Sequence, residues 1–122
     1  MMTAGDVLGV ARGWLNDPLV AGEGTRFLNA DMLKRLNAGQ VRLYGLRPDC
    51  VLYDDDTALS ADAPAATTSL TDTVTLPDRW IEPLAHFVCY LSFREDSDEH
   101  EANPEGKAGS ELRAFMEGVN SL

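Results

Sequence analysis

The sequence predicts an all-α fold, a single four-helix bundle-like domain over residues 1–122 with a long loop or small β-hairpin between the second and third helices. Apolar residues recur at three- and four-residue steps in four separate stretches, and residues typical of helix ends bound these stretches. A chain of 122 residues, 44% of them hydrophobic, is long enough to bury one core and too short for two.

The first helix is expected over residues 3–16. Thr3 is a good N-cap residue, and Asp6 places a negative charge in the first turn, where the helix dipole favours it. Asn16-Asp17-Pro18 should end the helix, because the residue before a proline is pushed out of the helical region. The predicted inner stripe is Val7, Val10, Ala11, Trp14 and Leu15.

The second helix is expected over residues 29–45, with Asn29 as its N-cap and with Gly45 and Pro48 ending it. Its inner residues should be Leu33, Leu36, Val41 and Tyr44. Its outer face should be basic and carry Lys34, Arg35 and Arg42.

Asn37 falls beside the inner stripe of this helix. Burial of an amide costs free energy unless the amide is hydrogen-bonded, so we expect its side chain to bond loop backbone. The alternative is an asparagine at the edge of the stripe that faces solvent.

Residues 46–77 form a long connection. Two β-prone pieces within it, Cys50–Tyr53 and Ser69–Leu76, are candidates to pair as a hairpin around the tip 54–66. A connection of this length inside a small domain is usually functional or mobile.

The third helix, expected over 79–95, has the strongest pattern and should be central. The fourth is expected over 104–120, with Asn103 as its cap and Pro104 at its first position. The predicted inner residues of the third helix are Trp80, Ile81, Leu84, Ala85, Phe87, Val88, Cys89, Leu91 and Phe93, and those of the fourth are Ala108, Leu112, Phe115, Met116 and Val119.

Bulk properties exclude several classes of protein. A net charge of -10 argues against wrapping nucleic acid, because a DNA-binding surface must be basic to displace counterions from phosphates. The N-terminus lacks the basic and apolar regions of a signal peptide, and no stretch approaches the roughly 20 apolar residues of a membrane span. Cys50 and Cys89 have no neighbouring cysteine or histidine at ligand spacing, so we expect reduced, buried thiols.

The residues predict no catalytic site, no cofactor and no metal. Motifs for phosphate cradling, nucleophilic hydrolysis and zinc catalysis are missing, and His86 in its apolar helix is expected to be a packed residue with one hydrogen bond rather than a general base. The acidic run from Glu95 to Glu101 could be mistaken for the start of an EF-hand calcium loop. Such a loop would need a glycine at Glu101 and a carboxylate at Lys107, and both are missing. We therefore expect solvated acidic turns there and at 54–56.

Four segments, in order, resemble the short head-to-tail adaptor proteins of tailed bacteriophages, prophages and gene transfer agents. They are TAGDVLGVARGWLND, FLNADMLKRLNAGQ, VTLPDRWIEPLAHFVCYLSFREDSD and GSELRAFMEGVNSL. The motifs that carry the resemblance are the Leu15-Asn16-Asp17 corner, the Leu36-Asn37-Ala38-Gly39-Gln40 segment, Leu76-Pro77 before the third helix, and the acidic turn from Glu95 to Asp98 at its end.

The resemblance implies a non-enzymatic virion protein of the neck, made in the host cytoplasm. It implies a ring of about twelve copies that joins the portal to tail or stopper proteins and leaves a channel for genomic DNA. Two other classes remain open: a small helical interaction or regulatory module of a bacterial operon, and a metal-dependent enzyme that uses the acidic clusters.

Charge segregation suggests the residues of the subunit interface. We hypothesise that the basic residues of the second helix face an acidic turn of the neighbouring subunit. The basic set is Lys34, Arg35 and Arg42; the acidic sets are Asp54, Asp55 and Asp56, and Glu95, Asp96, Asp98, Glu99 and Glu101.

Overall fold

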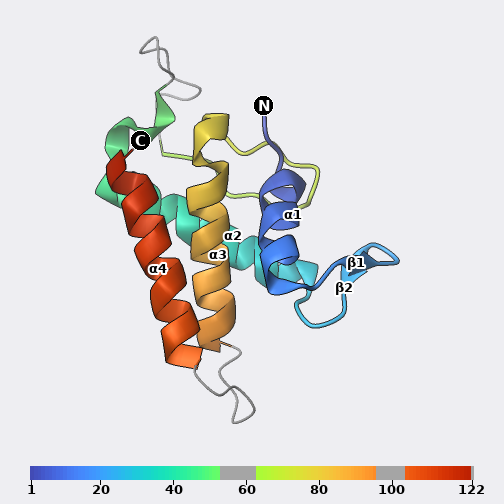
Figure 1. The fold of residues 1–122 in the computed structure, drawn as a ribbon. Coiled ribbons are helices and arrows are strands. Elements are labelled where there is room, and N and C mark those ends of the chain that lie inside the picture. The colour runs from blue at the N-terminus through green and yellow to red at the C-terminus, as the bar shows by residue number, and fades with distance from the viewer. Residues whose placement is uncertain (53–62, 96–103, 122) are drawn as a thin grey trace.

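The computed structural model describes residues 1–52, 63–95 and 104–121, and the described chain is mostly helical (Figure 1). The predicted all-α fold with four helices is confirmed. The helices are α1 (Ala4–Leu15), α2 (Asn29–Leu46), α3 (Ile81–Glu95) and α4 (Pro104–Ser121), with short 3-10 helices η1 (Pro48–Val51) and η2 (Asp78–Trp80). The strands β1 (Leu19–Val20) and β2 (Glu23–Gly24) pair as an antiparallel hairpin.

The hairpin lies between α1 and α2, not in the connection where the sequence suggested one. Its two turn residues, Ala21 and Gly22, both have positive φ, 54° and 80°, as the tight turn of a two-residue hairpin requires. In the later connection, Cys50 and Val51 belong to η1, and Thr73 makes an isolated bridge to Thr3. From residue 47 to residue 77, the described chain is therefore loop and 3-10 helix apart from this isolated bridge.

Helix α3 lies at the centre and contacts α1, α2 and α4, as predicted. In Figure 1, α4 runs antiparallel beside α3, and α2 crosses behind it. The inner stripes predicted for α3 and α4 are confirmed, since Trp80, Leu84 and Phe115 are fully buried. None of the described helices is long and apolar enough to cross a membrane.

One predicted inner residue of α2, Val41, lies on the exposed side of the helix. Val41 is 73% exposed, whereas Leu43 is fully buried. Leu36 and Leu43 lie seven residues apart, about two turns, so they share a face; Val41 is five residues from Leu36 and points away from it. The inward placement of Val41 is wrong.

The ends of α1 are as predicted. The backbone N–H of Asp6 donates to Thr3 Oγ1 at 3.1 Å, and the N–H of Thr3 donates to Asp6 Oδ2 at 2.8 Å, which completes a capping box. Asn16 adopts the left-handed conformation, with φ 54°, and ends the helix.

The predicted cap of α2 is wrong. Leu28 is the N-cap residue and makes no side-chain cap bond. Asn29 is the first helical residue, and its backbone N–H donates to Glu23 Oε1 at 2.5 Å. A carboxylate from the preceding hairpin therefore does what the sequence assigned to the Asn29 side chain.

Asn37 does what the sequence predicts. Its Nδ2 donates to the Thr67 carbonyl at 2.8 Å, and its Oδ1 accepts the Thr67 N–H at 2.8 Å. The loop is also held to α1, because the N–H groups of Ala4 and Gly5 donate to the carbonyls of Asp72 and Leu70, each at 2.8 Å. The described part of the long connection is thus bound to two helices.

Both cysteines are fully buried, and burial raises the pKa of Cys50 to about 11 and that of Cys89 to about 12. The thiolate is the reactive form, so neither thiol should react with Ellman's reagent in native buffer, and both should react after unfolding in urea. A time course of the absorbance that the reagent gains on reaction, recorded in native buffer and in urea, measures the rate of labelling of the two thiols. Rapid labelling of either residue in the folded chain would contradict the burial.

Candidate functional site

The exposed side of α2 carries a surface that we call the basic α2 face: Lys34, Ala38, Val41 and Arg42. Steps of three, four and seven residues place these side chains on one side of the helix. Among the described residues, neither Lys34 nor Arg42 forms an ion pair. Beside them is a shallow hollow of about 480 Å³ that Val41, Arg42 and Phe87 help to line.

Arg35 lies elsewhere, so its predicted place on the outer face is wrong. It is 8% exposed, and its Nε and Nη2 contact Glu95 Oε2 of the same chain at 3.0 and 2.9 Å. Its Nη1 donates to Ser92 Oγ at 3.2 Å. Arg35 and Glu95, which the sequence placed on opposite sides of a subunit contact, are therefore joined within one chain.

The other acidic residues of the interface hypothesis lie outside the described residues. They are Asp54, Asp55, Asp56, Asp96, Asp98, Glu99 and Glu101. Within the ranges that the structure describes, no group of three or more histidine, cysteine or acidic side chains is placed to hold a metal ion.

A second surface, which we call the acidic hollow, lies where the first turn of α3 meets the last turns of α4. It measures about 450 Å³, and Asp78, Glu82, Pro83, Glu117 and Gly118 are among its lining residues. Glu82 and Glu117 are exposed, and neither forms an ion pair with a described residue.

The sequence did not reveal this hollow, because its two acidic walls come from helices far apart in the chain. The backbones meet closely there: a Cβ on Gly118 would lie 2.7 Å from Pro83 Cγ. Arg79 also lines the hollow, and its Nη2 donates to the Leu52 carbonyl at 2.6 Å.

His86 lies at the edge of the acidic hollow, and the prediction of a packed residue with one hydrogen bond is confirmed. Its Nδ1 lies 2.6 Å from Glu111 Oε2, and its ring stacks on Trp14 with 4.3 Å between the ring centroids. These contacts join α3 to α4 and α1. Trp14 is 43% exposed, so its predicted place in the core is wrong, whereas Trp80 is a core residue as predicted.

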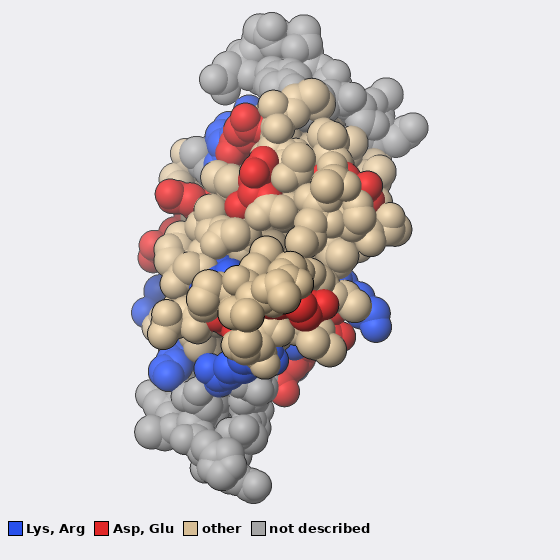
Figure 2. Space-filling view, turned by 90° about the vertical axis from the view of Figure 1, so that its right-hand side faces the viewer, with Lys and Arg blue, Asp and Glu red and all other residues tan. Residues whose placement is uncertain are grey.

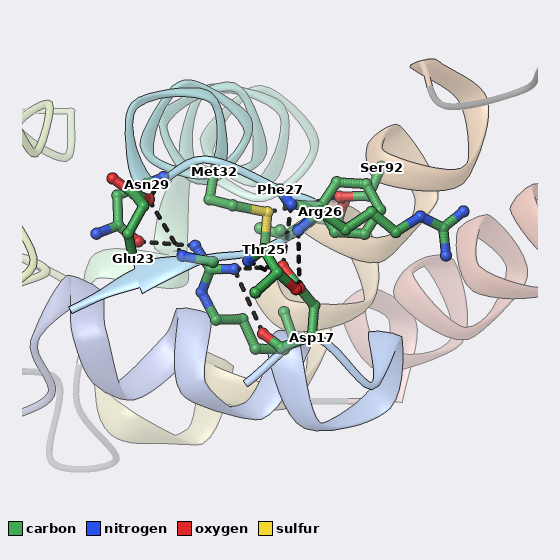
Figure 3. A network of polar contacts seen from close by, with 12 residues as sticks. Asp17, Glu23, Thr25, Arg26, Phe27, Asn29, Met32 and Ser92 are labelled. Atoms are coloured by element: carbon green, nitrogen blue, oxygen red, sulfur yellow. Dashed lines mark hydrogen bonds and ion pairs between the residues drawn. The ribbon is translucent and has the colours of Figure 1, made fainter. Parts of the chain in front are cut away.

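Asp17, which follows α1 and is 1% exposed, is the centre of a polar network (Figure 3). Arg12 Nη1 donates to its Oδ2 at 2.8 Å, and Arg12 is itself 4% exposed. The remaining donors come from the segment after the hairpin: Thr25 N at 3.2 Å, Thr25 Oγ1 at 2.8 Å, Arg26 N at 3.0 Å and Phe27 N at 3.0 Å.

This network fixes the ionisation of Asp17. Burial alone would raise the pKa of its carboxyl, but hydrogen bonds from Phe27, Thr25 and Arg26, with the charge of Arg12, lower the pKa below its ordinary value. Arg12 Nη2 also donates to Asn29 Oδ1 at 2.7 Å. The ion pair therefore sets the position of the hairpin and of the start of α2 relative to α1.

A third surface runs along α1 beside the hairpin. A groove of about 390 Å³ is lined by residues that include Leu8, Gly9, Pro18 and Leu19, and Leu19 and Val20 are 46% and 59% exposed. Figure 2 shows that uncharged side chains cover most of the centre of this side of the molecule.

Comparison of the chain with protein-family models, with curated proteins and with solved structures gave no match. The fold places the chain in the class of all-helical, bundle-like domains, with a short hairpin added.

Proposed function

We propose that the chain is a structural adaptor of the neck of a tailed bacteriophage or a related particle, in which copies form a ring between the portal and the tail or stopper proteins. The observation that carries the proposal is the order of the motifs along the chain, from the Leu15-Asn16-Asp17 corner to the Leu76-Pro77 step.

The roles of two motif residues in the fold support the proposal. Asp17 organises the corner after α1, and Asn37 binds the Thr67 backbone of the long connection. Motifs that fix the shape of a subunit suit a protein whose work is assembly. A ring protein needs a rigid body and lateral surfaces, and the proposal requires no reaction at any of the surfaces described above.

The net charge of -10 also fits the proposed channel. DNA must pass through such a ring without being held, and negative surface potential disfavours contact with phosphates. The neck of the virion, with the host cytoplasm during assembly, is the location that the proposal entails.

The test is assembly on a portal. The chain is co-expressed with the portal protein that the proposal requires in the same genome, the complex is purified by a tag on the portal, and particles are imaged by negative-stain electron microscopy. We expect the chain to co-purify and to add a ring of density with an open centre. A chain that leaves every portal particle unchanged would refute the adaptor role.

The runner-up is a helical protein-interaction module, which the exposed Val41 and the hollow beside it favour. Size-exclusion chromatography with light scattering separates the two. Such a module forms a small complex with its partner, whereas the adaptor forms a ring alone or on the portal.

A further inference from the structure

The basic α2 face and the acidic hollow carry unneutralised charges of opposite sign. Lys34 and Arg42 on the first surface, and Glu82 and Glu117 on the second, form no ion pairs among the described residues. Both cations are exposed in the described fold, although the whole chain has 20 acidic residues and 10 basic ones. This pattern favours an acidic partner for α2.

The two surfaces also match in form. Lys34 and Arg42 are eight residues apart, about 12 Å along the helix, with Ala38 midway and the exposed Val41 beside Arg42. Glu82 lies in the first turn of α3 and Glu117 near the end of α4, and both line the acidic hollow beside Pro83 and Gly118. One surface thus offers exposed apolar side chains beside two cations, and the other offers a recess lined by carboxylates.

We propose that the basic α2 face of one subunit docks on the acidic hollow of the next copy of this chain, with Lys34 and Arg42 near Glu82 and Glu117 and with Val41 in the recess. The inference rests on the proposed ring. The two surfaces share no residue, so the contact is heterologous, and such a contact generates a ring when the rotation between neighbours closes.

The experiment reverses one charge on each surface. Arg42→Glu places a carboxylate against the acidic hollow, and Glu117→Lys places a cation against the basic α2 face. Sedimentation velocity over a range of concentrations should show each variant associating with itself roughly tenfold or more weakly than the wild type. Wild-type association should also weaken as salt rises, because exposed charges are screened.

Mixing the two variants is the decisive measurement. The carboxylate introduced by Arg42→Glu in one variant then meets the ammonium group introduced by Glu117→Lys in the other. The unaltered Arg42 and Glu117 of the two variants also meet, so both kinds of contact are attractive. We expect the equimolar mixture to recover the wild-type association that neither variant shows alone. A loss of folding cannot produce this recovery, and circular dichroism checks that both variants are folded.

Arg94→Glu is the matched control. Arg94 is exposed near the end of α3, the opposite end of that helix from Glu82, forms no ion pair with a described residue, and undergoes the same charge change as Arg42 in its variant. The self-association of this variant should stay within about twofold of the wild type, since Arg94 lines neither surface.

Three results would overturn this contact: a wild-type chain that is monomeric at every concentration, variants that associate like the wild type, or a mixture that does not recover. The adaptor role is judged separately by portal binding. Portal binding with unaffected variants would reject this interface alone, whereas self-association without portal binding would reject the adaptor role and leave the contact standing.

Discussion

Replacing Asp17 with alanine should destabilise the folded chain by about 3–5 kcal/mol, the cost of breaking a buried ion pair from one side. The variant leaves the Arg12 guanidinium, 4% exposed, without its carboxylate. It also removes the acceptor from the N–H groups of Thr25, Arg26 and Phe27. Equilibrium unfolding in urea, followed by far-ultraviolet circular dichroism, measures the loss.

Asp31→Ala is the control for this variant. Asp31 is exposed in the first turn of α2, where its carboxylate interacts with the helix dipole, so the same truncation should cost about 0.3–1 kcal/mol. In the double variant with Arg12→Met, the loss should be smaller than the sum of the single losses, because no unpaired charge then remains. Equal losses for Asp17→Ala and Asp31→Ala would show that the network does not stabilise the fold.

The same carboxylate should make stability depend on pH. Its pKa is lowered in the folded chain, so Asp17 contributes stability above the unfolded pKa of about 4. That contribution is lost as pH falls through the folded value. The difference in unfolding free energy between the wild type and Asp17→Asn should therefore be constant near neutral pH and shrink in acid. A difference that grows in acid would contradict the lowered pKa.

The helices could be predicted from sequence because their signals are local. Periodicity of apolar residues located all four, and the capping box at Thr3 needs only residues within one turn. The wrong inward placement of Val41 also comes from relying on local periodicity. A single hydrophobic residue such as Val41 can fit more than one helical stripe, and packing in the core decides that Leu43 is buried instead.

The hairpin could not be predicted from periodicity, because each of its strands has only two residues. The Asp17 network could not be predicted either, because most of its donors are not within one turn of Asp17. An aspartate before a proline at a helix end signals only that the helix stops. Its burial depends on donors eight to ten residues later, and these converge on it only after the turn at Ala21 and Gly22 has formed.

Half of the candidate site was visible in the sequence. Lys34 and Arg42 share one helix face by simple spacing, so the basic α2 face could be predicted. Arg35 lies next to Lys34 in sequence, but its long side chain reaches Ser92 and the end of α3. The acidic hollow needs the antiparallel packing of α3 and α4, which no local pattern encodes.

Gly24→Ala should cost about 3 kcal/mol, at the upper end of the usual penalty for overpacking. A Cβ at this position would overlap Arg12 Nη1 and the Phe27 carbonyl oxygen, and it would lie 2.7 Å from Asp17 Oδ2. The carbonyl belongs to the backbone and cannot rotate away, so the hairpin must shift and take the network with it. Thermal unfolding, followed by circular dichroism at 222 nm, measures the effect.

Gly9→Ala supplies the contrast, because it makes the same chemical change where there is room. No atom outside α1 lies within 4 Å of a Cβ built on Gly9, which is an exposed interior position of the helix. Alanine there should stabilise the chain by about 0.5–1 kcal/mol, since glycine loses more backbone entropy in a helix. A loss of stability for Gly24→Ala together with a gain for Gly9→Ala would show that close packing around Asp17 leaves no room for a side chain at position 24. Equal tolerance would mean that β2 and the Arg12–Asp17 pair do not pack as closely as described.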